Sequence, residues 1–153
     1  MKNLSHLDAR GEARMVDVSA KPAVDRRAVA SGEIRLRPGT ISAIEKNQVA
    51  KGNVFATARI AGIMAAKKTG DLIPLCHPLA LAHCDVDFAI PSTRDRVVIT
   101  ASARITAATG VEMEALTAVS VAALAIYDMC KSVDKTMRIT NITLVSKTKS
   151  GCK

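Results

Sequence analysis

Two cysteines and two histidines lie close together in the segment LIPLCHPLALAHCDVD, residues 72–87. Cys76 precedes His77, and the pair returns in inverted order as His83 and Cys84. Thiolate and imidazole groups are ligands that zinc prefers, and a thiol can also serve in redox chemistry. The segment therefore raises three possibilities: a metal site, a redox site, or a site of another kind.

The spacing of these four residues argues against a structural zinc site. Such sites typically use two cysteines separated by two to four residues and two histidines separated by three to five, and the segment lacks both patterns. Residues 81–90 alternate as a β-strand does, so His83 and Cys84 point to opposite faces. We expect Cys84 to be buried as a small hydrophobe and His83 to be solvated beside Asp85. No metal is expected here.

Cys76 and His77 differ, because they lie in a loop between Pro74 and Pro78. The two prolines stiffen that loop, which suits it to hold side chains and amides for a ligand. A connector with an incidental histidine would have the same composition. The residues alone leave both interpretations open.

A second group of charged residues follows the apolar run AVSVAALAIY. Asp128 and Lys131 are one helical turn apart and Lys135 follows, so one helix face is expected to carry an acid and two bases. An ordinary exposed ion pair would look the same and contributes little. The neighbouring apolar run instead favours the edge of a packed interface, where proton affinities shift.

Other candidates have weaker patterns. Lys51 and Gly52 precede Asn53, a good helix N-cap, so free amides and an ammonium could cradle a phosphate there, although no complete phosphate-loop motif is present. Glu112 fits a capping partner, Glu114 favours a helix start, and Met113 is by default a core residue.

Composition sets the broad class of the protein. The 153 residues are 48% hydrophobic, enough for one domain with a core. The 22 Lys and Arg against 14 Asp and Glu give a net charge of +8, which indicates an anionic partner: nucleic acid, anionic lipid or a phosphorylated metabolite. No apolar run approaches the roughly 18 residues of a membrane helix, and the start lacks the apolar core of a signal peptide, so a cytoplasmic protein is expected. Without C-x-x-C pairs, the cysteines are expected to be thiols.

The order of expected elements defines the fold class. We predict a flexible arm over residues 1–27, a single α+β domain over 28–147 and a basic tail over 148–153. The expected elements are a strand over 30–37, a helix from about 40, a helix from 54 to Gly70, a hairpin of strands 81–90 and 97–107, a helix from Thr109 to about 133, and a strand over 137–147. This is a ferredoxin-like βαββαβ order: a four-stranded antiparallel sheet with helices packed on one face.

The two long helices also bear on partners. VFATARIAGIMAA and ALTAVSVAALAIY are apolar nearly all round, more than one sheet face requires, which predicts a homo-oligomer; a monomer with a very apolar core is the alternative. A basic βαββαβ domain is also the outline of an RNA-recognition module. That module stacks bases on sheet aromatics, and here Phe55 and Tyr127 fall on helices while Phe88 points inward, so no nucleic-acid partner is expected.

Longer stretches carry a family resemblance. KGNVFATARIAGIMAAKKTGDLIPLCHPL and TGVEMEALTAVSVAALAIYDMCKSVD closely resemble the MoaC family, the cyclic pyranopterin monophosphate synthases of molybdenum cofactor biosynthesis, and SHLDARGEARMVDVSAK is similar to that family's beginning. The resemblance covers about Leu4 to Val145. It implies a lyase that converts 3',8-cyclo-7,8-dihydro-GTP to cyclic pyranopterin monophosphate and pyrophosphate. It also implies a homohexamer, a trimer of dimers with active sites at the dimer interface, and no cofactor is expected. The lack of a long apolar run predicts no membrane partner.

The resemblance also implies roles for particular residues. Asp128 matches a position in acid-base catalysis, and Lys51 and Lys131 match essential basic positions. The substrate-contacting positions are matched by Leu75, Cys76, His77, Met113 and Glu114, and further pocket positions by Glu112 and Arg26. Whether magnesium accompanies the triphosphate stays open. The tail from Thr148 is assigned no function.

Overall fold

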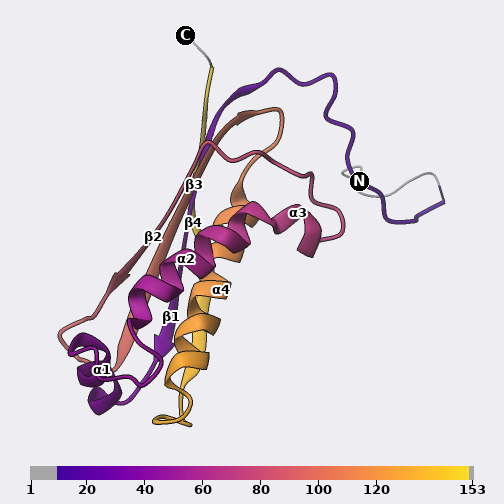
Figure 1. The fold of residues 1–153 in the computed structure, drawn as a ribbon. Coiled ribbons are helices and arrows are strands. Elements are labelled where there is room, and N and C mark those ends of the chain that lie inside the picture. The colour runs from indigo at the N-terminus through magenta and orange to yellow at the C-terminus, as the bar shows by residue number, and fades with distance from the viewer. Residues whose placement is uncertain (1–9, 152–153) are drawn as a thin grey trace.

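The computed structural model describes residues 10–151, so the start of the expected arm and Cys152 lie outside the described residues. In chain order the elements are β1 (Val24–Arg35), α1 (Pro38–Glu45), α2 (Val54–Lys67), α3 (Thr69–Leu72), β2 (His83–Ala89), β3 (Arg96–Ala107), α4 (Glu112–Cys130) and β4 (Arg138–Ser150). Figure 1 shows α2 and α4 side by side along the sheet.

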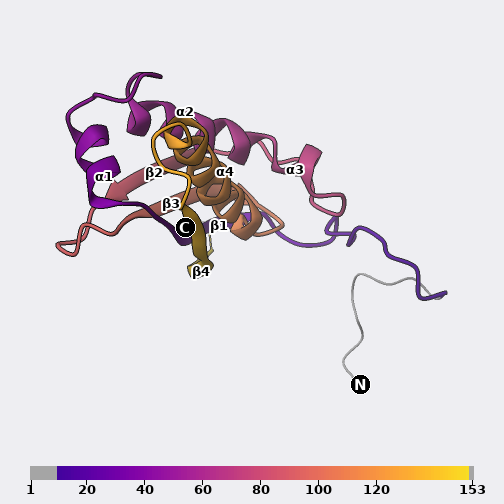
Figure 2. The same ribbon diagram turned by 90° about the horizontal axis from the view of Figure 1, so that it is seen from below.

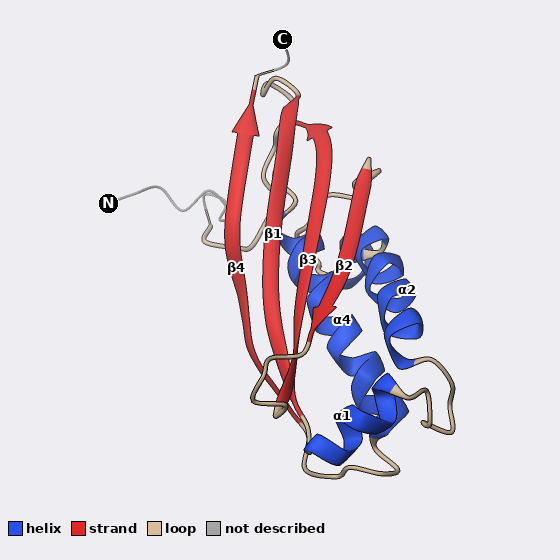
Figure 3. Ribbon diagram, turned by 90° about the vertical axis from the view of Figure 1, so that its left-hand side faces the viewer, coloured by secondary structure: helices blue, strands red, loops and turns tan. Residues whose placement is uncertain are grey.

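The strands form one sheet in the order β2-β3-β1-β4, and each neighbouring pair is antiparallel. Figure 3 shows the strands in front of the helices, and Figure 2 shows the same two layers from below. One sheet face is covered by α2 and α4, and the other faces solvent. The predicted ferredoxin-like α+β fold is confirmed.

Alternating burial along the strands builds the core. In β3, buried Val97, Ile99 and Ala101 alternate with more exposed residues, as expected for a half-buried strand. In β2, Val86 is fully buried while His83 is exposed, so the predicted separation of His83 from half-buried Cys84 is confirmed. The core side of the sheet is apolar throughout its centre, and this side receives the helices.

Small residues let α4 approach its neighbours closely. A Cβ added to Gly32 of β1 would lie 2.7 Å from Cγ1 of Val119, and one added to Gly62 of α2 would lie 2.8 Å from the carbonyl oxygen of Ala118. A methyl group at Gly32 would meet the side chain of Val119, and one at Gly62 would meet the backbone of α4, so both positions favour glycine. The position of α4 is fixed from two sides, by the sheet and by α2.

The length and composition of α4 would suit a membrane span, but half of its most apolar window is buried inside the protein. Its buried residues face the sheet and α2, where the contacts of α4 are made. We therefore interpret α4 as a core helix.

Two strands are longer than the sequence predicted. β1 begins at Val24 rather than near residue 30, and β4 runs to Ser150 rather than 147. Both extend past the residues 28 and 147 expected to bound the domain. Charged side chains obscure the alternating pattern at these strand ends. The strands extend because their backbones still pair: Val24 pairs with Ala107, and Asp25 pairs with Ser150.

Two predicted helix ends were wrong. Gly70 lies within α3, and the preceding helix α2 already ends at Lys67. A Cβ on Gly70 would lie 2.9 Å from Pro78 Cα, so the glycine permits a close contact between these two segments. α4 begins two residues later than a Thr109 cap would allow, and its N-cap, Val111, makes no side-chain capping bond. The predicted Asn53 cap is confirmed, because its side chain accepts a hydrogen bond from the Ala56 N–H at 2.9 Å.

A buried carboxylate fixes the chain after α4. Asp134 is fully buried and accepts hydrogen bonds from the Arg37 N–H at 2.9 Å and the Thr136 N–H at 3.0 Å. Burial alone would raise the pKa of Asp134, but these donors, with the hydroxyls of Thr136 and Thr40, lower it below its usual value. The C-terminal end of α4 is thereby tied to the start of α1.

The close contact at Gly62 yields a stability prediction. Gly62→Ala should lower the free energy of unfolding by about 1–3 kcal/mol, because overpacking against Ala118 outweighs the gain in helix propensity. Gly39→Ala in α1 is the matched control, since a Cβ there meets nothing within 4 Å. Urea denaturation of both variants checks this; equal stabilities would contradict the packing argument.

Candidate functional site

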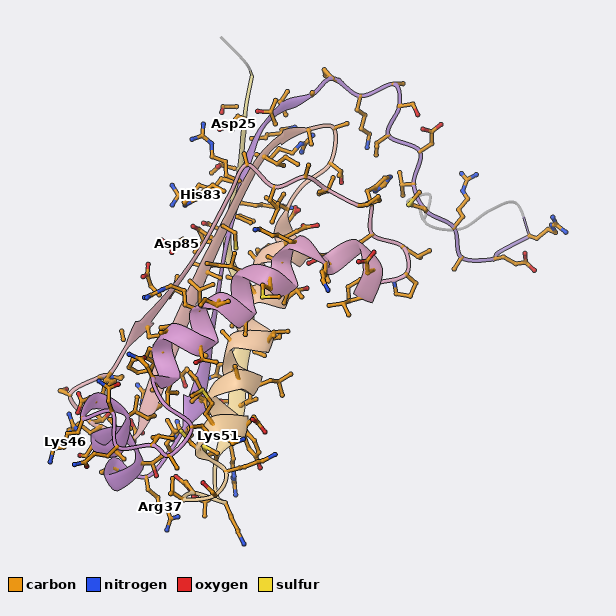
Figure 4. The ribbon with its side chains drawn as sticks, in the orientation of Figure 1. Asp25, Arg37, Lys46, Lys51, His83 and Asp85 are labelled. Carbon is orange, nitrogen blue, oxygen red and sulfur yellow. The ribbon has the colours of Figure 1, made fainter. Side chains whose placement is uncertain are left out.

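A carboxylate between two ammonium groups lies at the C-terminal end of α4. Lys51 Nζ lies 2.7 Å from Asp128 Oδ2, and Lys131 Nζ lies 2.7 Å from Asp128 Oδ1. Lys51 Nζ also donates to the backbone oxygen of Asp128 at 3.0 Å, one of the carbonyls left free where a helix ends. Figure 4 labels Lys51 at this end of the molecule, in the loop before α2.

This cluster differs from the one that helix periodicity predicted, although the family resemblance had named Lys51 together with Asp128 and Lys131. α4 ends at Cys130, so Lys135 does not continue its charged face as expected. The second ammonium comes instead from Lys51, 77 residues away along the chain. The loop reaches Asp128 through Gly52, whose φ of 96° suits glycine, and through the Asn53 cap of α2.

The two lysines set the protonation of the cluster. Hydrogen bonds from Lys131 and Lys51 lower the pKa of Asp128 to about 2. The same contact raises the pKa of Lys131. The Asp128 side chain is 55% exposed, so solvent and a ligand can reach it. At neutral pH the cluster is therefore an ionised carboxylate between two lysine side chains.

A second cluster lines a cavity of about 300 Å³ near the N-terminal end of α4. Its walls include six of the residues predicted to contact substrate or line the pocket: Leu75, Cys76, His77, Glu112, Met113 and Glu114. The loop after α3 supplies the first three, and α4 supplies the others. The wall also includes three residues of the expected arm: Val16, Val18 and Lys21.

A neighbouring cavity of about 320 Å³ shares Gly110 and Glu112 with the first and contains Arg26. Arg26 is held by hydrogen bonds to the carbonyl oxygens of Ala107 and Ala108 at 2.9 and 3.0 Å. Lys147 Nζ lies 3.0 Å from a Glu112 carboxylate oxygen. The two cavities adjoin through these shared residues, and we refer to them together as the depression; Arg26, Arg27, Lys147 and Lys149 line its second cavity.

The two glutamates of this depression hold protons differently. Burial raises the pKa of Glu114, which is only 3% exposed. Burial alone would raise the pKa of Glu112. Its own backbone N–H and Lys147 stabilise the charged form, however, so the pKa of Glu112 is lowered. Burial and Glu114 raise the pKa of Cys76, which favours the thiol. Glu114 is therefore the better proton donor and Glu112 the better ion-pair partner.

The structure separates the predicted residues into these two groups. Asp128 lies 15 positions after Met113 on one continuous helix, which at the rise of an α-helix is about 22 Å. Figure 1 shows the two ends of α4 at opposite ends of the helical layer. Within one chain, a single small ligand cannot contact both groups.

Sequence reasoning missed the lysines of β4 and the arm. Lys147 and Lys149 line the second cavity, and Lys21 lines both the first cavity and a further one beside Arg26. Lys147 and Lys149 are two apart on a strand, so they share a face with each other and with Arg26, the partner of Lys149. That alternation could have identified them.

The alternative sites find little support. Among residues 10–151 no group of three or more His, Cys, Asp or Glu side chains is placed to hold a metal ion. Figure 4 shows His83 and Asp85 on β2, away from Lys51. Phe88 stacks on Phe55 with ring centroids 4.9 Å apart, so its ring is engaged in the core.

Comparison with known proteins identifies the family of this chain. The MoaC family model matches residues 15–150. The chain belongs to the MoaC family. A protein of Pelotomaculum thermopropionicum is 60% identical over 99% of this chain and 90% of its own length. A protein of Roseiflexus sp. is 58% identical over 96% of this chain and 93% of its own length. A protein of Heliobacterium modesticaldum is 54% identical over 99% of this chain and 96% of its own length. Each relative is named cyclic pyranopterin monophosphate synthase.

The ion pairs of Asp128 predict its titration. In the parent protein the Asp128 carboxyl should titrate with a midpoint near pH 2, and in Lys51→Ala or Lys131→Ala the midpoint should rise toward the ordinary aspartate value of about 4. Carbon-13 NMR of the side-chain carboxyl measures this. Lys46→Ala, an exposed lysine of the same loop, serves as the control and should leave the midpoint unchanged. An unshifted midpoint in both site variants would contradict the assigned contacts.

Proposed function

We propose that this chain is a cytoplasmic cyclic pyranopterin monophosphate synthase, a lyase that converts 3',8-cyclo-7,8-dihydro-GTP to cyclic pyranopterin monophosphate and pyrophosphate. The observation that carries the proposal is the Asp128 carboxylate held between Lys51 and Lys131, in a chain of the MoaC family. The substrate is a polyanion, which agrees with the net charge of +8.

The reaction needs two kinds of assistance. Rebuilding a purine into a pterin requires several proton transfers, which need a base and an acid within reach of the ring system. Forming the cyclic phosphate requires a substrate hydroxyl oxygen to attack the phosphorus nearest the ribose while the bond to pyrophosphate breaks. The charge that develops on pyrophosphate must be stabilised by cations.

The described residues divide these tasks. Asp128 is assigned the role of proton acceptor, and Lys131, whose Nζ lies 2.7 Å from its carboxylate, the role of returning a proton. Lys51 and Lys131 stabilise negative charge near the reacting atoms. Glu114 and His77 contact the ring system from the cavity wall, and Arg26 receives the phosphates. Charge and hydrogen-bonding capacity support these roles.

Both groups of residues must meet one substrate molecule, although about 22 Å separates them along α4. We therefore propose that each active site is shared between two copies, one giving Lys51, Asp128 and Lys131, and the other giving the Cys76-His77 cavity. The proposed assembly is a homohexamer, a trimer of dimers. Exposed apolar side chains on the helices, such as Ile60 at 60% and Leu124 at 56%, support burial in an assembly.

Removing the proposed base should abolish turnover without dismantling the protein. Asp128→Asn is expected to lower turnover by about 10²–10⁴-fold, because the amide keeps the shape but cannot accept the proton. Pterin and pyrophosphate release from the cyclic nucleotide measures turnover, and light scattering measures the assembly. Asp87→Asn, on the exposed face of β2, is the matched control and should stay active. An active Asp128→Asn enzyme would show that Asp128 is not the base. A parallel assay of the parent protein with a chelator tests whether turnover requires magnesium.

Sharing of the site predicts complementation between inactive variants. Asp128→Asn and His77→Ala should each be inactive, but co-refolded mixtures should recover roughly a quarter of the parent turnover, because half of the random pairs contain one site free of both changes. Asp128→Asn mixed with Lys131→Ala is the control and should not recover, since both changes fall in the same half of every site. No recovery in the first mixture would exclude the shared site.

A further inference from the structure

A second carboxylate lies close to the proposed base in the chain and is completely buried. Asp134 follows Asp128 by six residues, and its side chain is 0% exposed. Its Oδ2 accepts hydrogen bonds from the Arg37 N–H at 2.9 Å and the Thr40 hydroxyl at 3.0 Å. Its Oδ1 accepts them from the N–H and the hydroxyl of Thr136 at 3.0 and 2.8 Å. A buried carboxylate with these donors is held rigidly and holds the donors in turn.

These bonds anchor the turn that follows α4, and this turn carries Lys131. The N–H groups of Val133 and Asp134 donate to the carbonyl oxygen of Cys130, the last residue of α4, at 2.9 and 3.0 Å. The Arg37 guanidinium donates from Nη2 to the carbonyl oxygen of Val133 at 2.7 Å, and its Nε lies 3.2 Å from Asp134 Oδ1. Lys131 therefore lies between the helix and an anchored turn, which fixes its backbone from both sides.

The opposite side of the same anchor leads to Lys51. Arg37 is the N-cap of α1, which ends at Glu45, six residues before Lys51. A hydrogen bond from the Gln48 N–H to the carbonyl oxygen of Ala43 at 2.8 Å holds the turn after α1. Figure 4 shows Arg37 and Lys51 at the same end of the molecule. A shift of α1 relative to α4 would therefore move the Lys51 ammonium as well.

The two ion pairs of Asp128 need this anchoring because they are exposed. The side chains of Lys51 and Lys131 are 47% and 57% exposed, and each ammonium lies 2.7 Å from the carboxylate. Exposed ion pairs contribute little free energy by themselves, since solvent screens them and two long side chains must be ordered. The short distances therefore depend on how firmly the backbones of the two lysines are held.

We propose that Asp134 is a positioning residue for the proposed reaction: by joining the start of α1 to the turn after α4, it holds two ammonium groups on either side of Asp128. These are the ammonium groups of Lys51 and Lys131. The catalytic consequence rests on the proposed function, because the cluster contains the proposed base. A purely structural Asp134 would stabilise the fold without affecting how Asp128 binds its proton, so the titration of Asp128 separates the two roles.

Replacing the buried carboxylate by an amide tests the proposal. In Asp134→Asn the amide NH2 faces an N–H donor, from Arg37 or Thr136, whichever way it is turned, so one half of the anchor is lost. By carbon-13 NMR, the Asp128 carboxyl should then titrate about one pH unit higher than in the parent protein, because the loosened lysines favour its charged form less. Turnover should fall roughly 10–10²-fold with KM nearly unchanged, since a misplaced catalytic group slows the chemical step.

A second variant avoids a buried substitution. The Arg37 side chain is 59% exposed, so Arg37→Ala should remain folded while releasing two contacts of the anchored turn. It should raise the Asp128 midpoint in the same direction by a smaller amount. Arg35→Ala is the matched control, because the Arg35 side chain is 53% exposed and pairs with Asp95 instead. The control should leave both the midpoint and the turnover unchanged.

Circular dichroism establishes that each variant is folded. The proposal is overturned if folded Asp134→Asn titrates as the parent does, or if Arg35→Ala raises the Asp128 midpoint as much. If Asp134→Asn does not fold, Arg37→Ala against its control decides the question. The titration needs no substrate, so an inactive parent protein would refute the proposed function without affecting this test. An active parent whose Asp128 midpoint is unmoved by these changes would refute only the positioning role.

Discussion

The close packing of α4 between the sheet and α2 is the constraint on which the rest of the structure depends. Gly32 and Gly62 allow approaches that a methyl group would block, and fully buried alanines of α4 fill the narrow space that remains. Dispersion and burial at such short range leave the helix little freedom to rotate or slide. Its outward stripe, and therefore the position of Asp128, follow from how its inward face is filled.

Electrostatics then distinguish the two ends of the helix. At the C-terminal end, Lys51 and Lys131 hold Asp128 as a carboxylate, and Asp134 ties the following loop to α1. At the N-terminal end, burial favours the neutral form of Glu114 while Lys147 favours the charged form of Glu112. One end thus offers a carboxylate between two lysines, and the other offers a depression with a neutral-favouring carboxyl and several cationic side chains. A reaction that moves protons and expels pyrophosphate requires both.

The same rigidity that positions each end also keeps the ends apart. A straight helix cannot bring Asp128 and Met113 of one chain to a single small molecule, because its length exceeds that of the ligand. The proposed sharing of each site between two copies would solve this problem without bending the helix.

The sequence determined the fold class, the alternation of the strands, the Asn53 cap and the membership of the family, because these depend on local periodicity and on long matching segments. It also indicated that Asp128 and Lys131 act together, since they are one helical turn apart. The resemblance named Lys51 as well, but only the tertiary structure decided that Lys51 and not Lys135 contacts Asp128, that β1 begins at Val24, and that Lys147 faces Glu112. These outcomes depend on contacts between residues far apart in the chain, where strand pairing and helix packing override local pattern.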